Sequence, residues 1–226
     1  MKKVAIFDFC ETLCDFQTAD AYVDYVREHS NHKLINIRER VNVLLRKSRL
    51  LDVACILTRF RYPLGKLLKL RQLKGLSLNL LEEMARGYYE EEIRPHLIPL
   101  LVDKLREHQE KGHEVLLISG GYGIYLKYFA EEYGINMIIS SNIGFDVKGR
   151  CTGSLKGSDC MNENKVKLLR QIVPDLKDDD IVASYSDSSS DIPILCIAQQ
   201  SFVVSRNHQP WVDNYNFNEI IWTYNR

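Results

Sequence analysis

The 226-residue sequence has no net charge, because 30 Lys and Arg residues balance 30 Asp and Glu residues. This balance provides no general electrostatic surface for nucleic acid or an anionic membrane, so we expect neither as a partner. The sequence also lacks an apolar run near the ~20 residues that a membrane-spanning helix needs. Its first residues, MKKVAIFDF, contain too short an apolar run for a secretory signal. We therefore expect a cytoplasmic protein, whose oligomeric state the sequence leaves open.

Cysteine pairs with metal-ligand spacing are absent as well. None of the six cysteines forms a C-x-x-C pair, so we expect free thiols rather than a zinc site. The hydrophobic share of 45% and the charged share of 27% are typical of a globular chain. The length allows one large domain, or a core with a smaller insert. The cysteines are Cys10, Cys14, Cys55, Cys151, Cys160 and Cys196.

The stretch KVAIFDFCET, residues 3–12, organises the rest of the chain. Four apolar residues, 4–7, predict a short buried strand, and Asp8 follows directly at its carboxyl end. Open α/β sheets bind ligands at this end of their strands. Because a buried carboxylate needs a cation or several donors, we expect Asp8 to face an opening rather than a core.

Apolar strands alternate with helical patterns in the second half of the chain. This alternation predicts a mostly parallel, doubly wound α/β sheet. We expect a hairpin or flap over residues 145–155, where Gly149 and Gly153 interrupt the pattern. The further expected strands cover residues 114–119, 136–140, 181–185 and 201–205, and the expected helices cover residues 98–110, 122–133, 162–173 and 190–198.

A long interval without strand patterns, residues 16–92, separates the first strand from the second. It predicts five helices: 19–29 capped by Thr18, 34–46, 50–60, one that starts at Pro63, and 76–92 capped by Ser77. Eleven Lys and Arg residues between positions 38 and 74 make it basic. Most of these are expected on solvated faces, with one or two lining a cleft that receives an anion.

Four sites along the chain follow the expected strands or begin a helix after them. Each has an ordinary interpretation when taken alone, as a turn, a helix terminus or a solvated lysine. Together, and in this order, they resemble the four motifs of the haloacid dehalogenase-like superfamily, over residues 1–13 and 94–204. They are Asp8, the run Ser119-Gly120-Gly121, Lys165, and Asp187 with Asp191.

The resemblance implies an α/β core of residues 1–15 and 93–226 with an inserted helical cap of residues 16–92. The run from residue 93 to residue 121 resembles the phosphoserine phosphatase-like branch. Members of the superfamily remove phosphate from small metabolites through an aspartyl phosphate, which implies Asp8 as the nucleophile. Lys165 would offset the negative charge, while Ser119, Gly120 and Gly121 would bind phosphate oxygens at a helix start.

The resemblance also implies Mg²⁺ as cofactor. Asp8, the backbone carbonyl of Cys10 and Asp187 would supply its protein oxygens. Asp191 would hold a metal-bound water or orient Lys165.

Two positions depart from the pattern of the phosphoserine phosphatase-like branch. Gln17 stands where phosphoserine phosphatases carry a glutamate, so we expect a small phosphomonoester other than phosphoserine. Gln17 and Arg59, with Arg61 beside it, are candidate substrate contacts. Cys10 stands where the family has the aspartate that serves as acid and base, and a thiol is a weak substitute. Two alternatives therefore stay open: a phosphotransferase whose acceptor is not water, and a catalytically weak phosphate-binding protein.

Overall fold

The computed structural model describes residues 3–30 and 64–223, and within this part the strands form one six-stranded parallel sheet and a small hairpin. The order of the large sheet is β3-β2-β1-β6-β7-β8, so β1 lies inside it, between β2 and β6. The predicted fold class, a doubly wound and mostly parallel α/β sheet, is confirmed. The strands are β1 (Val4–Phe7), β2 (Glu114–Tyr122), β3 (Met137–Ser141), β6 (Ile181–Ser186), β7 (Ser201–Ser205) and β8 (Asn218–Ile221).

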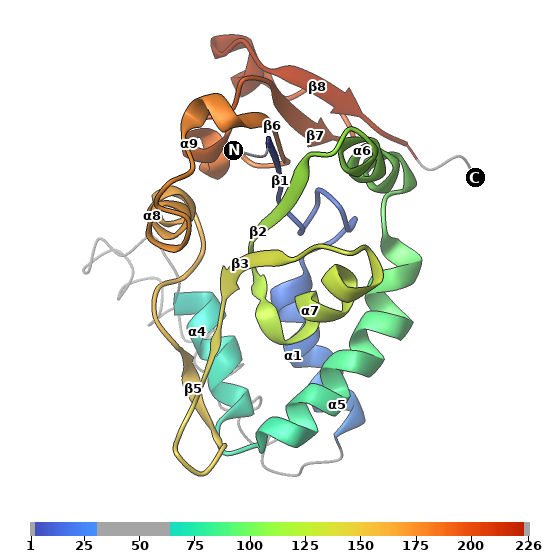
Figure 1. Cartoon of the computed structure of the whole chain (residues 1–226). Coiled ribbons are helices and arrows are strands. Elements are labelled where there is room, and N and C mark those ends of the chain that lie inside the picture. Colours follow the sequence, from blue (N-terminus) through green and yellow to red (C-terminus); the bar gives the residue numbers. More distant parts are fainter. Residues whose placement is uncertain (1–2, 31–63, 224–226) are drawn as a thin grey trace.

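Helices cover both faces of the sheet (Figure 1). Successive residues of a strand point to opposite faces, and β1 follows this rule. Ala5 and Phe7 belong to the larger core, with α1 (Thr18–His29), α5 (Leu78–Tyr88), α6 (Pro99–Glu110) and α7 (Gly123–Glu132). Val4 and Ile6 belong to a second core, with α8 (Glu163–Ile172) and α9 (Ile192–Leu195). The apolar run of β1 is thus explained by burial on both faces.

The described helices of the interval 16–92 pack on one another and on the hairpin. Helix α1 contacts both α4 (Leu64–Leu70) and α5. The hairpin, β4 (Ile143–Phe145) and β5 (Cys151–Leu155), lies beside α4 (Figure 1). Its Cys151 accepts a hydrogen bond from the Gly75 amide at 2.7 Å and donates one to the Leu76 carbonyl at 2.8 Å. The hairpin therefore belongs with the helical segment in space.

Several predicted boundaries need correction. Ser77 caps α5 as expected, because its hydroxyl accepts from the Leu80 amide at 3.3 Å. Thr18 does not cap α1; it is the first helical residue, and its hydroxyl bonds elsewhere. The predicted helix 190–198 is only four residues long as α9. Strand β8 carries no alternating apolar pattern and was not predicted. Predicted helices 34–46 and 50–60, and Pro63, lie outside the described residues.

Short helical turns connect several elements. The π-helical turn Tyr89–Ile93 and the 3₁₀ turn Arg94–His96 continue α5 toward α6. The remaining 3₁₀ turns are Arg71–Leu73, Asp178–Asp180, Ser189–Asp191 and Pro210–Asn214.

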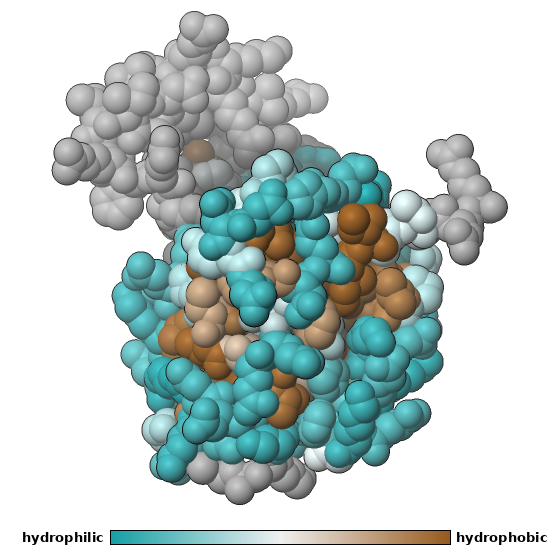
Figure 2. Space-filling model, turned by 90° about the horizontal axis from the view of Figure 1, so that it is seen from above, coloured by the Kyte–Doolittle hydropathy of each residue, from teal (hydrophilic) through white to brown (hydrophobic). Residues whose placement is uncertain are grey.

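Apolar residues at the surface are scattered. Seen from above Figure 1, they form separate patches among hydrophilic side chains (Figure 2). The exposed large ones belong to different segments: Leu100, Val147, Ile172, Tyr215 and Ile221. Among the described helices, none combines the length and the apolar character that crossing a membrane requires. The described cysteines carry free thiols, as expected.

Candidate active site

The carboxyl ends of β1 and β6, with the end of β2 and the start of α8, surround a cavity of about 270 Å³. Parallel strands present these ends at the same edge of a sheet, which explains why motifs far apart in sequence meet here. Of the predicted site residues, Ser119 and Gly121 are not among those that line the cavity, and Arg59 lies outside the described residues. The predicted residues that line it are Asp8, Cys10, Gln17, Gly120, Lys165, Asp187 and Asp191.

A buried ion-pair network fixes the centre of this cavity. The Lys165 ammonium lies 3.1 Å from Asp8 Oδ1 and 2.5 Å from Asp191 Oδ2, and the lysine is 2% exposed. The Ser186 hydroxyl donates to Asp191 Oδ2 at 2.6 Å. Burial by itself lowers the pKa of Lys165, but the charges of Asp8 and Asp191 outweigh it and raise that pKa above its ordinary value. Lys165 is therefore a permanent cation beside Asp8.

Negative charge exceeds positive charge in the described part of this site. Burial, together with the neighbouring charges of Asp8, Glu11 and Asp191, raises the pKa of Asp187 to about 8, against the opposing charge of Lys165. Burial likewise raises the pKa of Asp8 to about 6, against the opposing charge of Lys165. One lysine does not satisfy these carboxylates, so the site favours an additional cation.

Metal ligation at this site would need more than side chains. Within residues 3–30 and 64–223, no group of three His, Cys, Asp or Glu side chains is placed to hold a metal ion. The predicted set differs from such a group, because its third ligand is a backbone carbonyl, that of Cys10. The Asp191 Oδ1 atom is buried without a hydrogen-bond partner. Carboxylate and carbonyl oxygens are the donors that Mg²⁺ prefers.

Cys10 lines the same cavity as Asp8, but its thiol is hydrogen-bonded to Thr18, the first residue of α1. Its Sγ atom is 3.0 Å from the Thr18 hydroxyl, which is 2.8 Å from the Tyr125 hydroxyl. Burial and the nearby Asp8 raise the pKa of the Cys10 thiol. The thiolate is thus disfavoured, and Cys10 is poorly suited to move protons.

The second motif differs from the prediction in detail. Strand β2 continues to Tyr122, so Ser119, Gly120 and Gly121 lie within a strand rather than at a helix start. Ser119 is fully buried, and its hydroxyl accepts a hydrogen bond from the Gly121 amide at 3.1 Å. Gly120 forms the cavity wall. A Cβ atom there would clash with Met161 Sδ, so this position requires glycine unless the methionine moves.

Three charged residues outside the predicted set of site residues also line the cavity. Lys66, from α4, brings a second cation. Glu11 and Asp20 are exposed acids at the same cavity. Glu11 has a positive φ of 54° and accepts a hydrogen bond from the Gln17 amide group. Asp20 follows Gln17 by three residues in the first turn of α1, a spacing that places it near Gln17 once the helix start is known.

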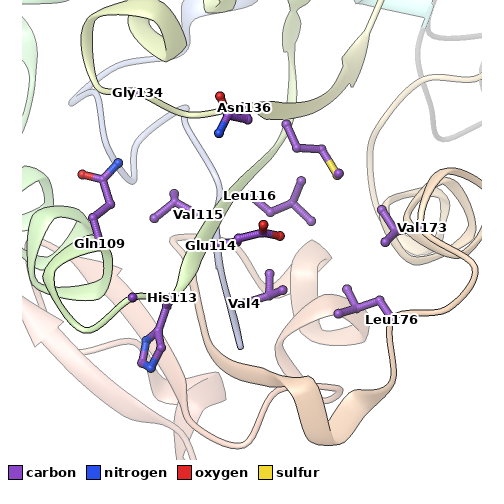
Figure 3. Close-up of a pocket in the computed structure, with 12 residues that line it drawn as sticks. Val4, Gln109, His113, Glu114, Val115, Leu116, Gly134, Asn136, Val173 and Leu176 are labelled. Atoms are coloured by element: carbon purple, nitrogen blue, oxygen red, sulfur yellow. The ribbon is translucent and has the colours of Figure 1, made fainter. Parts of the chain in front are cut away.

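Another cavity, of about 430 Å³, lies at the opposite, amino-terminal ends of β1 and β2. Val4, Val115 and Leu116 line it, and the Glu114 side chain points into it (Figure 3). Val173 and Leu176 close it from the side of α8 (Figure 3). It contains none of the predicted site residues.

The fold and the site together define an α/β protein with a cluster of buried carboxylates and a lysine at the carboxyl ends of its strands. A model of the haloacid dehalogenase-like hydrolase family matches residues 5–195. Because this match covers most of the chain, the chain belongs to the haloacid dehalogenase-like hydrolases. The predicted family and the prediction of a hydrolase are confirmed.

Individual relatives agree with this assignment. A histidinol-phosphatase from Neisseria meningitidis serogroup C (strain 8013) is 26% identical over 211 residues, which cover 91% of each chain. A protein of unknown function from Bordetella pertussis Tohama I has the same fold, with a TM-score of 0.77 at 20% identity, covering 97% of this chain and 99% of that one. A substrate-bound phosphoserine phosphatase superposes with a TM-score of 0.63 at 17% identity, covering 97% and 93%.

Proposed function

We propose that the chain is a phosphatase that removes phosphate from a small phosphorylated metabolite, with Asp8 as the nucleophile. The observation that carries the proposal is the position of Asp8: it is buried at the end of β1, 3.1 Å from the Lys165 ammonium, in the wall of a cavity. The histidinol-phosphatase relative, which matches 91% of the chain, supports the same reaction. We also propose a cytoplasmic enzyme, with residues 1–15 and 93–226 as the core and residues 16–92 as a helical cap.

The proposed reaction has two steps. An Asp8 carboxylate oxygen attacks the phosphorus atom, the bond from phosphorus to the substrate oxygen breaks, and an aspartyl phosphate forms. A water molecule then attacks the same phosphorus atom, and the bond to Asp8 breaks to release inorganic phosphate. In both steps Lys165 offsets negative charge, because its ammonium contacts the nucleophile and stays protonated.

We further propose that the site holds Mg²⁺. Asp8, the Cys10 carbonyl and Asp187 would supply the protein oxygens. Asp191 would orient Lys165 through their ion pair. The raised pKa of Asp187 supports this fit, because it indicates a buried carboxylate without enough positive charge around it. When bound, Mg²⁺ would neutralise charge on the phosphate oxygens during transfer.

The site lacks an efficient proton donor and acceptor at position 10. The substrate oxygen needs a proton as it leaves, and the attacking water must lose one. The thiol of Cys10, with its raised pKa and its contact to Thr18, favours neither transfer. We therefore propose that phosphates with good leaving groups react faster than alkyl phosphates.

The outer part of the cavity indicates the substrate class. Glu11 and Asp20 are exposed there beside Gln17, so this part is acidic. An acidic wall favours a substrate whose far end is positively charged. Histidinol phosphate, which carries an amine and an imidazole, has this property, and a relative is named for it.

A panel of phosphorylated metabolites, assayed for phosphate release with Mg²⁺ and with chelator, tests the proposal. We expect release from histidinol phosphate above that from neutral phosphomonoesters of similar size. Release must disappear with chelator and in Asp8→Asn. A chain that binds inorganic phosphate but releases none from any substrate would support the weak phosphate-binding alternative. Transfer to an added alcohol in preference to water would support the phosphotransferase.

A further inference from the structure

Lys66 connects the helical segment to the core at the cavity. Its ammonium lies 2.6 Å from the Gly120 carbonyl oxygen, 2.5 Å from Asp159 Oδ1 and 3.2 Å from the Ser141 hydroxyl. A lysine has three N–H donors, so these acceptors use all of them. The side chains of Lys66 and Asp159 are only 12% and 9% exposed. This arrangement is ordered and largely shielded from solvent, unlike a solvated surface lysine.

Two of the three acceptors of Lys66, Ser141 and Asp159, are bonded to each other. The Ser141 hydroxyl donates to Asp159 Oδ1 at 2.5 Å and accepts from the Cys160 amide at 3.0 Å. Ser141 ends β3, Asp159 lies in the loop before α8, and Gly120 lies in β2. Lys66 thus joins α4 to three separate segments of the core.

The contact with Gly120 fixes one peptide group. The Gly120 carbonyl and the Gly121 amide belong to the same planar trans peptide and point in opposite directions. Lys66 holds the carbonyl, and the Ser119 hydroxyl holds the amide at 3.1 Å. The pairing of β2 with β3 is irregular between Ser119 and Tyr122, so the ladder gives this peptide little support.

Two successive glycines make this support necessary. Glycine has more backbone freedom than any other residue, so an unsupported Gly-Gly peptide takes many orientations. Gly120 also forms the wall of the active-site cavity, next to Asp8 and Lys165. The orientation of this peptide therefore sets the shape of that wall.

We propose that Lys66 is a positioning residue that locks the Gly120–Gly121 peptide in place and thereby couples α4 to the active site. The consequence for catalysis depends on the proposed phosphatase function, whereas the structural coupling does not. Removal of the Lys66 ammonium should loosen the peptide and weaken the binding of phosphate. A misplacement of about 1 Å at a reacting site can cost ~10²-fold in rate.

The same helix offers a matched control in Lys69. Its ammonium bonds Asp24 Oδ2 at 2.8 Å, and its side chain is 11% exposed. Asp24 keeps a second partner, Arg27 at 2.8 Å, just as Asp159 keeps Ser141. Asp24 and Arg27 belong to α1, so this pair stays within the helical segment and does not contact Gly120.

Amide hydrogen exchange on the full chain, without substrate, tests the coupling directly. We compare the parent with Lys66→Met, Lys69→Met and the double variant Lys66→Met/Asp159→Asn. We expect the peptide that covers residues 119–122 to exchange about tenfold faster in both Lys66 variants and at the parental rate in Lys69→Met. The double variant removes the lysine and the charge of Asp159 together, so the loss of the Lys66 donor is tested without an unpaired Asp159 carboxylate. It also serves as the test if Lys66→Met alone does not fold.

The kinetic arm uses inorganic phosphate as a competitive inhibitor. We expect its inhibition constant and the KM to rise at least about tenfold in the Lys66 variants, with partial recovery in Lys66→Arg, whose guanidinium reaches the same acceptors. Parental exchange at residues 119–122 in both Lys66 variants would overturn the proposal. If the parent protein is inactive but exchange is faster in those variants, the proposed phosphatase function is refuted and the proposed coupling is supported.

Discussion

Replacement of Cys10 by aspartate tests whether this active site lacks only a proton donor. Cys10 is 7% exposed and shares the cavity with Asp8, and its Sγ atom is 3.0 Å from the Thr18 hydroxyl. A carboxyl group is similar in size to the thiol and accepts a hydrogen bond from the same hydroxyl. Assistance by a positioned acid or base is worth ~10²–10⁴-fold in rate. The variant Cys10→Asp should therefore hydrolyse alkyl phosphates faster than the parent.

The environment of the site sets the size of this gain. Burial among carboxylates raises the pKa of Asp8 to about 6 and that of Asp187 to about 8. A new carboxyl beside them should also have a raised pKa, which favours the protonated form that donates to the leaving oxygen. Bound Mg²⁺ and Lys165 act against this rise. We expect an increase in kcat of about 10²-fold for an alkyl phosphate, at the lower end of the usual range.

The assay measures kcat at saturating Mg²⁺ for two substrates, an alkyl phosphate and an aryl or acyl phosphate. The second kind needs little protonation of its leaving group, so we expect less than a tenfold gain for it. The matched control is Cys10→Asn, which has the size of aspartate but no acidic proton. If folded, metal-binding Cys10→Asp is no faster than Cys10→Asn on the alkyl phosphate, our reasoning on Cys10 is wrong. The chain then uses another proton route, for which Glu11 is the candidate at the same cavity.

Three further outcomes are expected. Asp8→Asn should lower kcat at least ~10³-fold with an unchanged melting temperature, because Lys165 keeps Asp191 as its partner; comparable turnover would refute the nucleophile. Lys165→Met should cost about 3–5 kcal/mol in urea unfolding without metal, because it strands buried carboxylates; a loss below 1 kcal/mol would contradict this. Burial, with the charge of His113, lowers the pKa of His108 to about 4, below the ordinary 6.5. The unfolded chain therefore binds the proton first, so this contribution to stability is complete above pH 6.5 and is lost toward pH 4. Urea unfolding should show about 3 kcal/mol of pH dependence that His108→Gln removes; an unchanged pH dependence would contradict it.

The sequence predicted well those features that depend on neighbours along the chain. The apolar run before Asp8 and the one before Asp187 end where a strand ends, so both acids were placed at the carboxyl edge of the sheet. Parallel strands bring such ends together whatever their order, which is why the core of the site was predicted without the strand order. Strand β8, with the sequence NEII, has no such run, and only its pairing with β7 defines it.

Two hydroxyl groups have hydrogen-bond partners that differ from those that their sequence positions predicted. Thr18 has the sequence position of a helix cap, yet its hydroxyl bonds Cys10 and Tyr125, which are 8 and 107 residues away. Ser119 has the position of a phosphate ligand, yet it is fully buried and holds the Gly121 amide. Thr18 thus has partners that tertiary packing supplies, whereas Ser119 bonds a backbone amide only two residues along the chain.

Lys66 shows the same limit for charge patterns. It belongs to a long basic interval, and nothing in that interval distinguishes Lys66 from Lys69, one helical turn later. The acceptors of Lys66 are 54, 75 and 93 residues away, whereas the acid that Lys69 contacts is 45 residues away within the helical segment. Residues three apart lie on neighbouring positions of one helix face, so the difference between the two lysines arises from the segments that lie beside each turn of α4. The partner of a basic residue in this interval is therefore set by the packing of its helix, which the folded chain alone determines.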